Sequence, residues 1–144
     1  MAKKPSGGCR VCEEYSTELI IAVKDETAGK NRLYHILISE SAALIWRLRC
    51  EWRISKQDDE TKWHSKVEIH NRWVSCINQR LSLDCQIVKT QKNGKHNLNP
   101  KIVLHTWSGC LENEEKLPDN WIRQPRVLVG IPYHKHDGSP TQSA

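Results

Sequence analysis

The stretch that decides the fold covers residues 32–51 and reads RLYHILISESAALIWRLRCE. From residue 33 to residue 52, apolar side chains recur at helical spacing and share one face, which consists of Leu33, Ile36, Leu37, Leu44 and Leu48, widened by Tyr34, Ile38, Ile45 and Trp52. This periodicity predicts a long helix over about residues 31–54. The last turns carry Arg47, Arg49 and Arg53, where the helix dipole favours cations.

A second block, residues 68–85 (EIHNRWVSCINQRLSLDC), has the same character. Ser65 and Glu68 form the pattern of a capping box, which predicts the start of a helix. One apolar face then continues for more than five turns through His70, Trp73, Val74, Ile77, Leu81, Cys85 and Val88.

A shorter third helix is predicted from Asn99, as N-cap, through Trp107 to a stop at Gly109. The segment 91–96, with Asn93-Gly94 at its centre, must turn the chain before it. Beyond the helix, Trp121 and the apolar segment 127–131 should hold an extended tail on the bundle. These patterns predict a mainly α-helical, three-helix domain over residues 30–131, followed by a disordered tail at 132–144.

Residues 1–29 are predicted to be an irregular N-terminal segment with one short strand, residues 18–23 (ELIIAV). No secretory signal and no apolar run of membrane-spanning length is visible, so the sequence predicts an intracellular protein of the nucleus or cytoplasm, with no membrane partner. In that compartment buried, reduced thiols are expected at Cys50, Cys76, Cys85 and Cys110.

The net charge of +5 is concentrated in residues 65–110, which hold seven Lys or Arg residues against Glu68 and Asp84. A basic segment interleaved with Trp is compatible with a polyanion such as DNA or RNA. The candidate contacts are Arg47, Arg49, Arg53, Arg72, Arg80, Lys89, Lys92 and Lys95. The alternative is that Trp46 or Trp52 and Trp73 are core anchors covered by the stems of the arginines.

Five blocks in consistent order resemble one family: residues 38–51 (ISESAALIWRLRCE), 68–73 (EIHNRW), 77–84 (INQRLSLD), 106–109 (TWSG) and 117–121 (LPDNW). They are similar to the C-terminal segment of fungal retroelement-derived proteins. In non-LTR retrotransposon polyproteins that segment follows the ribonuclease H domain and the reverse-transcriptase zinc-binding region. The resemblance covers about residues 27–131, and it implies a non-catalytic origin for this part.

The upstream zinc-binding pattern of that family is incomplete here. Cys9 and Cys12, followed by Ser16-Thr17-Glu18, begin it, but residues 19–21 (LII) stand where the family has its His. A zinc site needs four ligands, and this remnant supplies two, so no bound metal and no cofactor are expected. Recruitment of His64, His70 or a second chain would make a zinc-binding domain or a zinc-dependent enzyme, which is the weakest alternative.

Catalytic patterns are equally sparse. His105 with Cys110 is the one local Cys–His pair, and the carboxylates of residues 58–60 and 112–115 lie in polar loops with no apolar surroundings to perturb them. We therefore predict a non-enzymatic protein, with two competing roles: weak, non-specific nucleic-acid binding, or a protein-interaction module retained by a host genome.

Overall fold

The computed structural model describes residues 10–57, 59–90 and 98–134. Its elements in chain order are α1 (Arg10–Ile54), η1 (Glu60–Lys62), α2 (Lys66–Thr90), α3 (Pro100–Trp107), η2 (Glu114–Lys116) and η3 (Trp121–Arg123). These ranges contain three α-helices and no strand, apart from an isolated bridge between Leu111 and Val129. The predicted mainly helical fold is confirmed.

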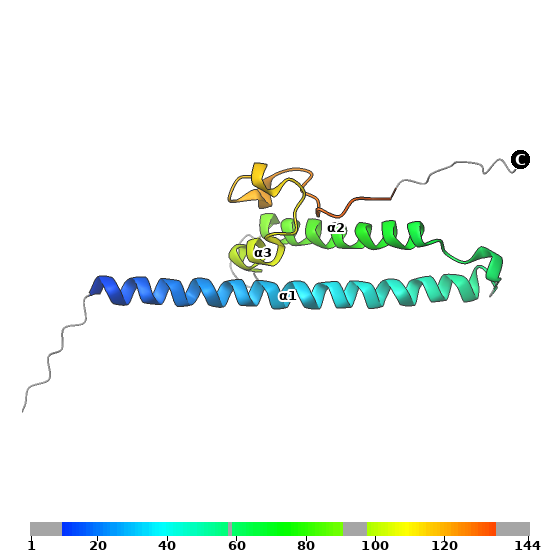
Figure 1. The fold of residues 1–144 in the computed structure, drawn as a ribbon, viewed down its shortest axis with the longest axis horizontal. Helices are drawn as coiled ribbons and strands as arrows, with labels where there is room; N and C mark the ends of the chain where they lie inside the picture. Colours follow the sequence, from blue (N-terminus) through cyan, green and yellow to red (C-terminus); the bar gives the residue numbers. More distant parts are fainter. Residues whose placement is uncertain (1–9, 58, 91–97, 135–144) are drawn as a thin grey trace, which may run out of the picture.

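Helix α1 is much longer than predicted, because it begins at Arg10 instead of near residue 31. The strand predicted over residues 18–23 is wrong: these residues are helical, and the predicted boundary at residue 29 falls inside the helix. No neighbouring strand exists within the described ranges to pair with ELIIAV, whereas helix propagation from an already packed segment adds one hydrogen bond for each residue fixed. Figure 1 shows the N-terminal part of α1 extending past α3 with no other described segment beside it.

The starts of α2 and α3 are confirmed. The Ser65 hydroxyl accepts a hydrogen bond from the backbone N–H of Glu68 (3.1 Å), and the Asn99 side chain accepts from the N–H of Lys101 (2.9 Å). Gly109, just after α3, adopts φ +77°, the left-handed conformation expected at a helix stop. The predicted turn at 91–96 lies outside the described residues, as does most of the predicted disordered tail, residues 135–144.

Helices α1 and α2 lie side by side, and α3 crosses them near the end of α2 (Figure 1). The crossing depends on Gly29, which is buried against α3: a Cβ atom on Gly29 would lie 2.6 Å from the backbone carbonyl carbon of His105. The main core cluster draws on all three helices and on the C-terminal segment, by which we mean residues 108–134 after α3. It consists of Ile36, Val74, Ile77, Leu81, Cys85, Val103, Trp107, Leu111, Trp121, Ile122 and Val129.

A buried carboxylate joins the three helices. Asp84 of α2 is fully buried and accepts two hydrogen bonds from the Arg32 guanidinium of α1 (2.7 and 2.8 Å). Its Oδ2 also accepts from the indole Nε1 of Trp107 in α3 (3.0 Å). Arg80 Nε is 3.8 Å from Asp84 Oδ1, which is too long for a hydrogen bond. The charge of Asp84 is therefore neutralised mainly by Arg32.

The C-terminal segment is fixed on α2 by amide side chains. The Asn78 amide oxygen accepts from the N–H of Val129 (2.9 Å), and Asn71 both donates to the carbonyl and accepts from the N–H of His134 (2.9 and 2.8 Å). Trp121 is buried, and Val129 packs into the core. The predicted roles of Trp121 and residues 127–131 as anchors are confirmed.

One part of the predicted apolar face of α1 is wrong. Tyr34, Ile38 and Ile45, which the sequence predicts to widen the packed face, are 64, 54 and 66% exposed. The reason is that α2 and α3 cover one side of α1 only, the side that contains the buried residues Ile36 and Leu44. An apolar strip of α1 is therefore left in solvent.

Candidate functional site

Three of the predicted nucleic-acid contacts are engaged inside the molecule. Arg72 donates to Glu51 of α1 (2.8 Å), and this hydrogen bond raises the pKa of Arg72. Arg80 lies beside the buried Asp84, and the Arg47 guanidinium donates to the Cys76 sulfur (3.1 Å). Arg47 and Arg72 therefore link α1 to α2, whereas Arg80 and Asp84 both belong to α2. Lys92 and Lys95 lie outside the described residues.

The structure brings together a smaller set on the solvent side of α1. Trp46, Arg49 and Arg53 are exposed and follow the spacing i, i+3, i+7, so they share one helical face. Trp46 is 68% exposed and is therefore no core anchor, whereas Trp73, also named in the alternative interpretation, packs against the core cluster. Lys89 is exposed in the last turn of α2, and Figure 1 shows that end of α2 beside α3 and far from the C-terminal turns of α1.

Burial works against thiolate formation at two of the cysteines. Cys50, Cys76, Cys85 and Cys110 are free thiols, and Cys76 and Cys85 are buried. Burial raises the pKa of Cys85 and of Cys110, and the nearby Glu114 raises that of Cys110 further. A raised pKa reduces the thiolate that a catalytic cysteine needs. The sulfur of Cys110 therefore lacks the activation that a catalytic Cys–His pair with His105 would require.

Polar side chains of His64, Glu68 and Glu51 lie together near the connection between α1 and α2. His64 is buried, and its Nδ1 donates to the Glu68 carboxylate (2.9 Å), a bond that lowers the pKa of Glu68. Glu51 Oε2 lies 3.6 Å from His64 Nε2, too far for a hydrogen bond, and that nitrogen has no hydrogen-bond partner among the described residues.

Within the described ranges, no three His, Cys, Asp or Glu residues are placed to hold a metal ion. Cys9 lies outside them, and Cys12 lies in α1.

An open apolar groove lies between α1 and α2, with a volume of about 410 Å³. We call it the α1–α2 groove, and its lining residues are Ser41, Leu44, Ile45, Leu48, Lys66, Ile69, His70 and Trp73. At the bottom of the groove, its floor, the indole Nε1 of Trp73 donates a hydrogen bond to the Ser41 hydroxyl (3.0 Å), so these two polar groups are paired with each other. The sequence patterns do not single out this site. Their one signal for it is an apolar face on residues 33–52 that is wider than one helical neighbour can cover.

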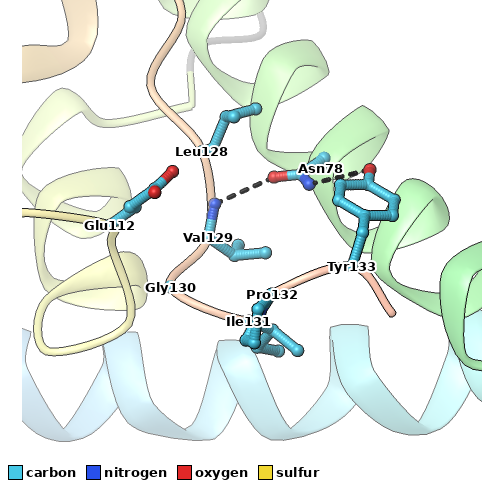
Figure 2. Close-up of a pocket in the computed structure, with 8 residues that line it drawn as sticks. All are labelled: Asn78, Glu112, Leu128, Val129, Gly130, Ile131, Pro132 and Tyr133. Carbon is cyan, nitrogen blue, oxygen red and sulfur yellow. Dashed lines mark hydrogen bonds between the residues drawn. The ribbon is translucent and has the colours of Figure 1, made fainter. Parts of the chain in front are cut away.

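A second pocket, of about 300 Å³, lies between α2 and the C-terminal segment. Figure 2 shows the amide of Asn78 reaching from α2 to the backbone N–H of Val129 and to the hydroxyl of Tyr133 (3.3 Å). Glu112 stands on the other side of the segment. Because Asn78 is occupied by these contacts, this pocket is part of the attachment of the C-terminal segment.

Comparison with protein-family models, with curated proteins and with solved structures found no match to this chain. Among the described helices, none combines the length and the apolar character that crossing a membrane demands.

Proposed function

We propose that this chain is a non-catalytic interaction module that binds a helix of a partner protein in the α1–α2 groove. The observation that supports the proposal is the apolar floor of the groove, which continues onto the solvent-exposed side chain of Ile45. Exposed, contiguous apolar surface with a polar rim is a feature of protein interaction sites. The groove volume, about 410 Å³, falls in the range of pockets that bind ligands.

The shape of the groove favours a helix as the ligand. Its α1 wall runs from Ser41 to Leu48, about two helical turns, and its α2 wall from Lys66 to Trp73 is equally long. Two helical walls of that length accept apolar side chains spaced i, i+3 or i+4, and i+7 from a third helix. The floor has no unmet hydrogen bond at Ser41 or Trp73, so apolar contact dominates.

The test uses a labelled helical peptide with leucines at i, i+3 and i+7 and glutamines at its other positions. We expect saturable binding, measured by fluorescence anisotropy, and we expect Ile45→Ser to weaken it at least tenfold because Ile45 forms the rim of the groove. Ile54→Ser is the matched control. Ile54 is also an exposed isoleucine of α1, 78% in solvent, but it lies outside the groove lining. Equal binding by the two variants, or no binding at all, would refute the proposal.

A second candidate function is weak, non-specific nucleic-acid binding, favoured by the exposed face of Trp46, Arg49 and Arg53. Arginines contact phosphates without reading the sequence, and an exposed Trp can stack on a base.

Titration of a labelled single strand at several salt concentrations tests this candidate. The double variant Arg49→Gln/Arg53→Gln should reduce the log K against log[salt] slope by about 0.7 for each phosphate that the variant no longer neutralises. Trp46→Ala should cost about 1–3 kcal/mol of binding free energy, because the base then has no indole on which to stack. Lys30→Gln, on the upstream part of α1, is the control and should leave the slope unchanged. Salt-independent binding, or none at low salt, would remove this candidate.

A retroelement origin, which the resemblance of residues 27–131 implies, is part of the same proposal. Finding adjacent coding sequence for a reverse transcriptase or a ribonuclease H would support it. An unrelated genomic context shared by homologous chains would argue against it.

A further inference from the structure

We infer that the partner helix carries carboxylates at the end that lies over Lys66 and Arg49, and this inference rests on the proposed function of the α1–α2 groove. It concerns the chemistry of the partner and its orientation, which the apolar floor alone does not determine.

The alignment of α1 with α2 places the cationic side chains of Lys66 and Arg49 at the same end of the α1–α2 groove. Helices α1 and α2 are antiparallel, and the hydrogen bond from Trp73 to Ser41 fixes one end of the groove. Leu48 and Ile69 therefore lie toward the other end, next to the connection between the helices. Lys66 is exposed in the first turn of α2 at that end. Arg49 is exposed on α1, one turn beyond Ile45.

No carboxylate offsets this charge within the groove. Its lining contains Lys66 but neither Asp nor Glu. Two carboxylates near this end are already engaged: Glu68, in the first turn of α2, accepts from His64 (2.9 Å), and Glu51, three residues beyond Leu48, accepts from Arg72 (2.8 Å). The positive end of the α2 dipole points the same way as Lys66 and adds to the potential.

The opposite end of the groove is neutral. It is closed by Ser41 and Trp73, which satisfy each other, and the nearby His70 Nε2 donates to the carbonyl of Pro132 (3.0 Å). A groove that is apolar along its length and positive at one end selects an amphipathic helix with acidic residues at one end. The same asymmetry specifies which way round the partner lies.

Three labelled peptides that share the leucine face, and differ only in Gln, Glu or Lys at the flanking positions, test the inference on the full chain. At low salt the affinity should fall in the order Glu, Gln, Lys, with at least a tenfold span. High salt should compress this span, since exposed charges are screened. The double charge reversal Lys66→Glu/Arg49→Glu should invert the order. A carboxylate in the first turn of α2 suits the helix dipole, so the fold should survive this change.

Lys101→Glu is the matched control, because Lys101 is an exposed lysine in the first turn of α3, away from the groove. It should leave the order of affinities unchanged. If the Gln peptide binds and the order is flat, or insensitive to the charge reversal, the inference about the partner falls while the groove remains a binding site. If none of the three peptides binds, both the inference and the proposed function fall.

Discussion

Replacing Asp84 with Ala should destabilise the protein by about 3–5 kcal/mol, because the substitution leaves a charged guanidinium largely buried without its partner. The Arg32 side chain is only 20% exposed, and it makes two hydrogen bonds to Asp84. The indole N–H of Trp107 loses its acceptor as well. In a thermal melt followed by circular dichroism, the midpoint should fall by roughly 10–20 °C.

Two further variants test whether the predicted loss of stability comes from the unpaired Arg32 charge. Arg80→Gln should cost under about 1 kcal/mol, since Arg80 Nε is 3.8 Å from the carboxylate and the side chain is 36% exposed. The double variant Arg32→Met/Asp84→Leu should be more stable than Asp84→Ala, because no unpaired charge is left inside. A decrease below about 1 kcal/mol for Asp84→Ala would mean that the carboxylate is hydrated and the network is absent.

The sequence predicted the elements of the bundle well, because the signals for α2 and α3 are local. Ser65 and Asn99 act as N-caps within a few residues of the N–H groups that they accept from, and the apolar period spans each helix. The burial of Asp84 is harder to predict from nearby residues. Asp84 lies three residues after Leu81 and seven after Ile77, on the apolar face of α2, and that position is the one local sign that it is buried.

The candidate groove is harder to predict than the helices. Whether Ile45 or Leu44 of α1 is covered depends on where α2 packs, and the α2 wall of the groove begins only at Lys66, 21 residues after Ile45. The basic residues carry a similar ambiguity. Arg72 and Arg49 are indistinguishable by residue type, but one is paired with Glu51 and the other is exposed. Composition counts both as available to a polyanion.

Gly29 is misleading in the sequence for a related reason. Gly29 is the last residue of the segment predicted to be irregular, and glycine in a helix interior is destabilising relative to alanine. The structure places Gly29 within α1, where the absence of a side chain admits the backbone of α3. Close approach between two helices is a tertiary requirement, and residues near Gly29 in the sequence do not reveal it.

Gly29→Ala should therefore destabilise the protein by about 1–3 kcal/mol, the usual cost of overpacking, although helix propensity alone predicts a gain of about 1 kcal/mol. The added Cβ would lie 2.6 Å from a backbone carbon of His105 and 2.8 Å from the backbone nitrogen of Thr106, so α3 must move as a unit. That movement would also disturb the hydrogen bond from Arg32 to the Thr106 hydroxyl (3.3 Å), and the effect should be non-additive with Asp84→Ala.

The neighbouring residue supplies the control for Gly29. Ala28 is exposed on the same helix, so Ala28→Gly changes propensity without changing packing and should cost about 1 kcal/mol. If propensity alone governed this part of α1, the two substitutions would have opposite signs in a urea unfolding experiment. We expect both to lower the free energy of unfolding, with the larger decrease at residue 29. A Gly29→Ala variant more stable than the parent would show that α3 does not cross α1 at this point.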